Sequence, residues 1–368
     1  MRVCIRVDSS ATIGAGHVMR CLALADALSE AGNNVRFICK EHTSNLIDKI
    51  IGLGYQVDRL SLGGHRCSYS SLAHAEWLGG TQEDDAEKTI VAIKSFRPEL
   101  IVVDHYAIDE YWHKRMRPYV KRIFVIDDLA DRRHDCDILL DQNLGSSKSK
   151  YSDLVPNSCM LLLEPKYALL RPEFAEWRDK SLQRRNQTTT PKNILVSIGG
   201  FDLHNITSDV VNKLSDLPSF NDTVVNVVLG SQSPHIGSVK SAVKKSSQKT
   251  TLHVDSNNMA ELMCQADLAI GASGSTSWER CALGVPTIQF VTAENQLKIA
   301  NELEKARAAI TARDPSELLS KFNGCNLNLA QMSNNAAMIC DGLGTNRIAK
   351  FIRIQNENRN TYLPESMV

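Results

Sequence analysis

Short apolar runs that alternate with helix-like stretches constrain the fold of this chain more than any other feature. In the first half the runs lie at Val3–Val7, Val35–Cys39, Tyr55–Leu60, Leu100–Asp104 and Ile123–Asp127, with helical spacing of apolar residues between them. Continuous apolar strands in this alternation are typical of a parallel sheet covered by helices on both faces. The pattern therefore predicts an α/β fold.

The same pattern starts again after a polar stretch at residues 181–192. It continues with runs that begin at Asn193, Val224, Leu252, Leu268 and Thr287. A chain of 368 residues is long enough for two domains. We expect an N-terminal α/β domain at 1–180, a linker at 181–192, a C-terminal α/β domain at 193–341, and a helix with a loose tail at 342–368.

The segment from Arg6 to His17 reads as a strand, a turn with Gly14 and Gly16, and a helix entrance. A helix N-terminus offers free N–H groups and a positive dipole end, which favour an anionic ligand and a neutral imidazole. A neutral imidazole accepts a proton. Met19 replaces the third glycine of the dinucleotide fingerprint, and the chain has no phosphate-loop Gly-Lys-Ser/Thr. The segment therefore predicts a small-molecule site without specifying NAD or ATP.

Polar residues follow the ends of three predicted strands in the first half. They are Asp8, Asp104, His105, Tyr106, Asp127 and Asp128. Ligands of parallel sheets bind beyond the carboxyl ends of the strands, on the rim where we also place His17. Two other interpretations stay open: Asp127 and Asp128 also suit a helix cap and a turn, and His105 suits a structural histidine.

The second half has its own strand-to-glycine turns, at Gly199-Gly200 and Gly230-Ser231, which indicate close backbone approach by a ligand. After Gly274, a helix that begins near Ser275 or Thr276 offers N–H groups for a diphosphate. Glu279 can accept hydrogen bonds from ribose hydroxyls, or it can merely complement the helix dipole. The amides of Asn295 and Gln296 suit hydroxyl recognition or a helix cap.

Composition narrows the class of protein. With 42 basic and 42 acidic side chains, the chain has no net charge to attract nucleic acid or an anionic membrane. Its ten cysteines form no Cys-x-x-Cys pair, and no apolar stretch approaches the roughly 18 residues of a membrane span. We expect a cytoplasmic monomer that uses neither a metal nor a cofactor.

Several motifs together resemble one family. They are Arg6-x-Asp8-Ser-x-x-x-Ile-Gly-x-Gly-His17-x-x-Arg20, Asp104-His-Tyr106, Asp127-Asp-Leu-Ala, Cys136-Asp-Ile-Leu-Leu, Tyr167-Ala-Leu-Leu-Arg, Gly199-Gly200, and Trp278-Glu-Arg-Cys followed by Asn295-Gln296. They are similar to those of the UDP-sugar hydrolases of pseudaminic acid biosynthesis, which remove UDP from UDP-2,4-diacetamido-2,4,6-trideoxy-β-L-altropyranose. The outline also resembles the GT-B architecture, in which two Rossmann-like domains face a cleft.

The resemblance implies roles for residues of both halves. The catalytic base falls on His17 and the sugar-side tyrosine on Tyr106. The substrate-binding candidates are Asp8, Gly14, Gly16, Arg20, Asp104, His105, Asn295 and Gln296. The UDP-binding candidates, all in the second half, are Gly199, Gly200, Gly230, Ser231, Met259, Gly274, Ser275, Thr276 and Glu279.

These features lead to a functional hypothesis. We expect a metal-independent hydrolase in which water attacks C1 of the UDP-sugar with inversion and the sugar carbon–oxygen bond breaks. The alternative is a GT-B glycosyltransferase with a UDP-sugar donor and an unidentified acceptor. A third possibility, a binding protein without catalysis, would not need a base on the sugar side.

Overall fold

The computed structural model describes residues 1–63, 72–185, 190–217, 220–324 and 327–360. The chain forms two compact units. Unit 1 contains Met1–Leu170 and the segment from Leu343 onward, and unit 2 contains Arg171–Gly342. Each unit has one parallel sheet, so the predicted α/β fold is confirmed.

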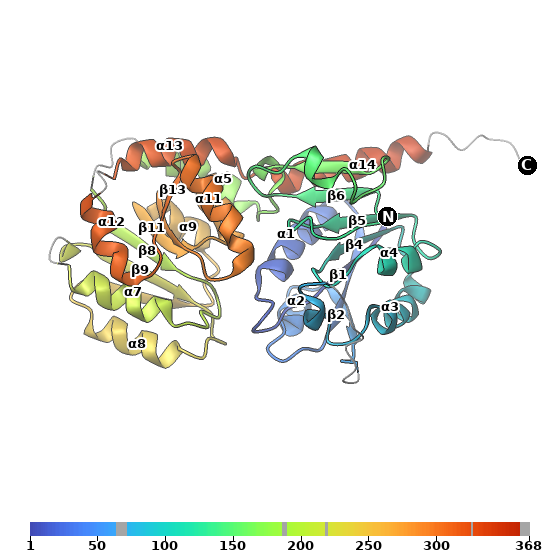
Figure 1. Ribbon diagram of the computed structural model, residues 1–368, viewed down its shortest axis with the longest axis horizontal. Coiled ribbons are helices and arrows are strands. Elements are labelled where there is room, and N and C mark those ends of the chain that lie inside the picture. Colours follow the sequence, from blue (N-terminus) through green and yellow to red (C-terminus); the bar gives the residue numbers. More distant parts are fainter. Residues whose placement is uncertain (64–71, 186–189, 218–219, 325–326, 361–368) are drawn as a thin grey trace, which may run out of the picture. The chain divides into compact units, whose positions relative to one another are not determined.

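Unit 1 has a seven-stranded parallel sheet with the strand order β3-β2-β1-β4-β5-β6-β7 (Figure 1). The strands are β1 (Arg2–Val7), β2 (Asn34–Lys40), β3 (Gln56–Leu60), β4 (Leu100–Asp104), β5 (Arg122–Ile126), β6 (Ile138–Asp141) and β7 (Met160–Leu163). The helices are α1 (Gly16–Glu30), α2 (Ile47–Gly52), α3 (Gln82–Phe96), α4 (Glu110–Met116) and α14 (Gly344–Asn360), with short 3-10 turns η1 (Ala75–Leu78), η2 (Lys148–Tyr151) and η3 (Pro165–Tyr167).

The C-terminal helix α14 belongs to unit 1 although it follows unit 2 in the chain. Ile348 and Ile352, one helical turn apart, are buried in the same core cluster as Leu24 and Leu28 of α1. The hydroxyl of Thr345 donates to the carbonyl of Leu170 at 2.7 Å. Figure 1 shows this red helix among the blue and green elements of unit 1. The tail expected to be loose lies outside the described residues from 361 onward.

Unit 2 has a six-stranded parallel sheet with the order β10-β9-β8-β11-β12-β13. The strands are β8 (Asn193–Ser197), β9 (Val224–Leu229), β10 (Lys249–Val254), β11 (Leu268–Ala272), β12 (Thr287–Phe290) and β13 (Ala309–Thr311). The helices are α5 (Glu173–Glu176), α6 (Arg178–Arg185), α7 (Ile206–Ser215), α8 (Ile236–Lys245), α9 (Met259–Gln265), α10 (Thr276–Ala282), α11 (Leu297–Lys305), α12 (Leu318–Gly324) and α13 (Leu329–Ile339), with 3-10 turns η5 (Glu294–Gln296) and η6 (Pro315–Glu317).

The segment expected as a linker is partly helix. Residues 178–185 form α6, whereas 186–189 lie outside the described residues. The buried guanidinium of Arg185 donates to the carbonyls of Leu283 at 2.8 Å and Ala266 at 2.7 Å, and the Ser181 hydroxyl donates to Leu283 at 2.7 Å. The polar composition that suggested a linker supplies donors for the open carbonyls at the ends of α9 and α10.

The two sheets bring the predicted strand ends together within each unit. β1 and β4 are adjacent and parallel, so Asp104 lies beside Val7 in register, at the edge where α1 begins. Within the described parts of the chain, no helix is both long and apolar enough to cross a membrane.

Candidate active site

The carboxylate of Asp104 holds two functional groups at the end of β4. Arg20 donates to it twice, from Nε to Oδ2 at 2.6 Å and from Nη2 to Oδ1 at 2.6 Å. His17 Nδ1 lies 2.6 Å from Oδ1. Burial opposes ionisation of this carboxyl, but the charge of Arg20 and the contact with His17 outweigh it and hold the pKa of Asp104 below its usual range. Asp104 is therefore an ionised acceptor.

This arrangement determines the tautomer of His17. An ionised carboxylate only accepts, so the proton of a neutral His17 lies on Nδ1, and Nε2 keeps the lone pair. Nη2 of Arg20, at 3.2 Å from Nδ1, is then a second donor facing that nitrogen and not a bonding partner. The described residues contribute no hydrogen bond to Nε2, and 8% of the His17 surface is exposed. His17 can therefore accept a proton at Nε2, and the imidazolium that results is balanced by Asp104.

Tyr106 lies against His17, but its hydroxyl is engaged. The two rings meet edge to face with centroids 4.8 Å apart, and the hydroxyl donates to Asp128 Oδ1 at 2.5 Å. Burial and the charge of Asp128 raise the pKa of Tyr106 well above its usual value. Only 4% of the residue is exposed. In this state Tyr106 positions the imidazole and keeps its own proton.

The two acids after β5 have different environments. Asp127 accepts from the backbone N–H of Ala130 at 3.0 Å and pairs with Arg132 at 2.8 Å, as a turn-forming residue does. Asp128 contacts Tyr106 and also Arg20, whose Nη1 is 3.3 Å away. The turn interpretation therefore fits Asp127, and the site interpretation fits Asp128.

Asp8 and His105 are buried next to these residues, in an ionic network. Arg6 pairs with Asp8 at 2.5 Å and with Asp85 at 2.7 Å, and Lys40 lies 3.0 Å from Asp85. His105 Nε2 lies 3.2 Å from Asp8. Burial lowers the pKa of His105, and its Nδ1 accepts from the N–H of Ala107, so the ring is neutral with its proton on Nε2, near Asp8 but without a hydrogen bond to it. The network anchors the residue that directly follows Asp104.

Sequence reasoning missed two aromatic residues at this site. Trp77 and His74 come from η1 and the residue before it, in a region that reads as a polar loop in the sequence. The ring of Trp77 stacks on that of Tyr106, with centroids 5.5 Å apart. The ring centroids of His74 and Trp77 are 4.4 Å apart. Neither residue belongs to a periodic pattern, so only their position in the fold reveals them.

The predicted helix entrance is present. Gly14 adopts φ +82°, a left-handed conformation that favours glycine, and Gly16 is the first residue of α1. No side chain within the described residues caps α1. The first-turn N–H groups beside His17 can therefore receive an anion.

In unit 2 the glycine turns after β8 and β9 contact each other. Gly230 N–H donates to the carbonyl of Gly200 at 3.0 Å. A Cβ on Gly230 would lie 2.6 Å from that oxygen, so a side chain has no room there. Gly199 has φ +144° and open space on its Cβ side, and the Ser231 N–H is bonded to Asp255 at 3.0 Å. Gly230 thus supports the Gly199-Gly200 turn, which remains open to a ligand.

The start of α10 is supported by a residue that sequence reasoning did not single out. Arg280 donates to the Ala272 carbonyl at 2.7 Å and to the Thr276 hydroxyl at 3.2 Å. Gly274 and Ser275 stay partly exposed, and no side chain among the described residues caps this helix. Burial raises the pKa of Glu279 to about 7, and the described residues provide its carboxyl with no hydrogen-bond donor.

The remaining candidates of unit 2 occupy nearby turns. Gln296 Oε1 accepts from the N–H of Thr292 at 3.0 Å, and its Nε2 would lie 3.7 Å from a Cβ on Gly274. Asn295 is half-buried in η5. Met259 is the first residue of α9 and is also half-buried. Gln296 therefore stabilises its own turn and lies beside Gly274, but its side chain makes no cap hydrogen bond to α11.

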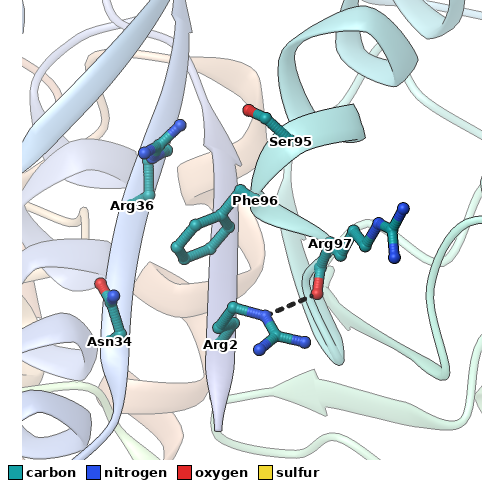
Figure 2. Close-up of a pocket in the computed structure, with 6 residues that line it drawn as sticks. All are labelled: Arg2, Asn34, Arg36, Ser95, Phe96 and Arg97. Carbon is teal, nitrogen blue, oxygen red and sulfur yellow. Dashed lines mark hydrogen bonds between the residues drawn. The ribbon is translucent and has the colours of Figure 1, made fainter.

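A cavity of about 410 Å³ also lies at the opposite end of β1 and β2 (Figure 2). Its lining residues are Arg2, Asn34, Arg36, Ser95, Phe96 and Arg97. Two of the three arginines already have partners: Arg2 donates to the Arg97 carbonyl at 2.9 Å, and Arg36 stacks on Phe96 at 4.6 Å and pairs with Asp58 at 3.3 Å. They complement the C-terminal end of α3, where the helix dipole disfavours anions, so this cavity is not the candidate site.

Comparisons with known proteins support the fold and part of the functional hypothesis. The sequence profile of the glycosyltransferase family 28 C-terminal domain matches residues 194–342. The chain is 27% identical, over 83% of its length and 97% of the relative, to the UDP-2,4-diacetamido-2,4,6-trideoxy-beta-L-altropyranose hydrolase of Campylobacter jejuni. It is 29% identical to an uncharacterised protein of Methanocaldococcus jannaschii, over 81% of this chain but only 57% of that protein.

Among solved structures, Acinetobacter baumannii MurG superimposes with a TM-score of 0.64, over 96% of this chain and 99% of that one, at 15% identity. This likeness concerns the fold alone. The chain therefore has the GT-B type of fold with two Rossmann-like α/β domains, as expected.

Proposed function

We propose that this protein hydrolyses a UDP-linked hexose to UDP and free sugar, with His17 as the general base. The observation that carries the proposal is the pair formed by His17 and Asp104, in which Nε2 is left available at a helix entrance. The similarity to the Campylobacter hydrolase supports UDP-2,4-diacetamido-2,4,6-trideoxy-β-L-altropyranose as the substrate, for entry into pseudaminic acid synthesis.

The proposed step is attack of water on C1. His17 Nε2 takes a proton from water, the water oxygen bonds to C1 with inversion, and the C1–O bond breaks so that UDP leaves with its bridging oxygen. Asp104 stabilises the imidazolium, as the acid of a catalytic triad does. UDP is a good leaving group, so positioning and electrostatic stabilisation supply the remaining catalysis.

Unit 2 is proposed to bind UDP. The Gly199-Gly200 turn, which has open space on its Cβ side, and the start of α10, which no described side chain caps, suit phosphate oxygens. Glu279, which has no donor of its own among the described residues, suits ribose hydroxyls. Asn295 and Gln296 are assigned to the sugar.

The test is incubation of the purified protein with the UDP-sugar and no acceptor, followed by chromatography of UDP and sugar. We expect stoichiometric release of both. A glycosyltransferase, the alternative that the family 28 match favours, would release UDP at a useful rate only when an acceptor is added. Failure to turn over any UDP-sugar without an acceptor would contradict the hydrolase proposal.

Heavy-oxygen water tests which bond breaks. In a short incubation, attack at C1 leaves UDP unlabelled, whereas attack at phosphorus places the label on the UDP phosphate. Mass spectrometry of UDP reads the difference without interference from exchange at the sugar anomeric centre. Labelled UDP would contradict the proposed step.

We also expect activity to be metal-independent, because a neutral imidazole can take the proton from water and UDP can leave without a Lewis acid. Dialysis against EDTA should leave turnover unchanged when it is measured in metal-free buffer. Loss of activity that magnesium restores would instead assign carboxylates such as Asp128 to a metal.

A further inference from the structure

An aromatic surface lies beside His17. Trp77 meets the His17 ring edge to face, with ring centroids 6.2 Å apart. It stacks on Tyr106 with centroids 5.5 Å apart and an interplanar angle of 29°. His74 lies 5.3 Å from Tyr106. Tyr106 is buried beneath this cluster, whereas Trp77 and His74 are both partly exposed. The aromatic surface that a ligand next to His17 can touch therefore belongs to Trp77 and His74.

The turn that carries Trp77 is anchored from inside the unit. The Lys40 ammonium, which is fully buried, donates to the carbonyl of Leu78 at 2.6 Å. Lys40 is itself held by Asp85, and Asp85 also accepts from the indole N–H of Trp112 at 3.0 Å. Burying a lysine is costly unless its charge is paired and bonded, so this contact commits the η1 turn to one position. The indole is thus presented by a fixed turn.

We propose that Trp77, together with His74, forms the apolar wall of the sugar pocket and selects hexoses that carry methyl groups where common hexoses carry hydroxyls. This assignment rests on the proposed function. An indole face packs against C–H and methyl groups, and it offers a hydroxyl no acceptor. A sugar with acetamido groups and a deoxygenated C6 carries several methyl groups, so the wall gains contact area with it.

The size of the expected effect follows from the chemistry of apolar pockets. One methyl group in such a pocket is worth about 10- to 100-fold in kcat/KM. The effect is a preference between substrates, so it differs from the effect of a base. Removing the wall should lower the preference while the proton transfer at His17 continues.

The experiment compares Trp77→Ala with the unaltered protein on three substrates: the diacetamido-trideoxy UDP-sugar, its 6-hydroxy analogue, and its N-formyl analogues that lack the acetyl methyls. We expect the unaltered protein to prefer the methyl-bearing sugar, and Trp77→Ala to reduce at least one of the two kcat/KM ratios by about 10-fold or more. Trp77→Phe should restore most of the preference, because it restores an aromatic face.

Two controls separate selection from general damage. Tyr111→Ala removes an exposed aromatic ring of α4, 46% exposed, and should leave both ratios unchanged. UDP affinity and the thermal midpoint of Trp77→Ala should match those of the unaltered protein. If Trp77→Ala lowers kcat/KM equally for all three substrates, or leaves both ratios as they were, the assignment is wrong.

Failure of the proposed function would look different. If the unaltered protein hydrolyses none of the three sugars, hydrolysis is contradicted, and calorimetric affinities of the same UDP-sugars then test Trp77. Loss of the methyl preference in binding to Trp77→Ala would still support the wall, and an unchanged preference would overturn it.

Discussion

At the scale of single residues, one carboxylate organises the candidate base. Asp104 receives both Arg20 and His17, and its ionisation places the imidazole proton on Nδ1. Without that acceptor, the Arg20 donor that faces Nδ1 at 3.2 Å would favour the other tautomer, with the proton on Nε2. The basic nitrogen is therefore selected by a neighbour 87 positions away in the chain.

Replacing His17 with Asn tests the base directly. We expect turnover to fall by about 10² to 10⁴, the usual contribution of a positioned base. UDP affinity, measured by calorimetry, should stay within a few-fold because the proposed UDP contacts lie in unit 2. A variant that turns over within a few-fold of the unaltered protein would remove His17 from this role.

Glu279 predicts a pH dependence of UDP binding. Because its pKa is raised to about 7, the free protein holds this proton at pH 6 and has mostly lost it at pH 8. Only the ionised carboxylate accepts from both ribose hydroxyls. We expect UDP to bind about tenfold more tightly at pH 8 than at pH 6, as titration of one required group implies.

Glu279→Gln is the control, because UDP itself also titrates in this range. The variant should lose the part of the pH dependence that Glu279 contributes. The stability of the free protein depends on pH with the opposite sign to UDP binding. A carboxyl pKa raised from 4.5 to about 7 on folding means that the free energy of unfolding falls as pH rises between these two values. Glu279→Gln should therefore raise the unfolding midpoint more at pH 8 than at pH 4. If UDP affinity depended on pH equally in the unaltered protein and in Glu279→Gln, the proposed role of Glu279 would be contradicted.

At the scale of elements, short helices and turns in unit 2 are held at both ends. Arg280 binds the start of α10, and Ser181 and Arg185 of α6 bind the Leu283 carbonyl just beyond its end. Burial without a carboxylate partner lowers the pKa of Arg185 to about 10. A seven-residue helix is marginal by itself, so these tertiary bonds account for its position.

Gly230→Ala should damage the turn that it supports. The new methyl would lie 2.6 Å from the Gly200 oxygen, so the backbone must shift. We expect a loss of about 1–3 kcal/mol in urea unfolding, as in overpacking, and weaker UDP binding. Gly237→Ala in α8, where nothing lies within 4 Å, is the matched control and should stabilise by about 0.5–1 kcal/mol. Equal effects of the two substitutions would contradict the close approach.

At the scale of the whole molecule, unit 1 is built from two separate stretches of the chain, whereas unit 2 is built from one. Unit 1 includes the last helix, α14, which follows unit 2 in the sequence. Ile348 and Ile352 then bury against the face of α1 that follows His17. The stability of the region around His17 therefore depends on residues more than 300 positions away, as the numbering of these two isoleucines shows.

Ile348→Ala tests this dependence. Truncating a fully buried isoleucine should cost about 2–5 kcal/mol, and hydrogen exchange should show the loss in α1 and β1 of unit 1. Ile354→Ala on the same helix, at a side chain 40% exposed, should cost less than about 1 kcal/mol. If Ile348→Ala lowered the free energy of unfolding as little as Ile354→Ala does, α14 would not stabilise unit 1.

Local patterns in the sequence were sufficient for the repeated architecture and for the turns and helix entrance at which the candidate residues lie. Apolar runs such as Leu100–Asp104 report their own burial, and in parallel sheets their carboxyl ends share one edge. Glycine turns and the helix entrance at His17 are also local, since each requires a particular backbone conformation within a few residues. The fold class and the place of His17 at a helix entrance therefore followed from the sequence alone.

Tertiary structure decided which side chains meet. Trp77 contacts His17, and His74 contacts Trp77 and Tyr106, on a turn that the buried Lys40 anchors. Residues 181–185 lie in a helix whose Ser181 donates to an open carbonyl elsewhere in unit 2. Asp127 and Asp128 are adjacent and identical, yet only their neighbours in space separate a turn residue from a site residue. Such contacts join residues far apart in the chain, where no periodicity records them, because the free energy of burial depends on distance in space and not along the sequence.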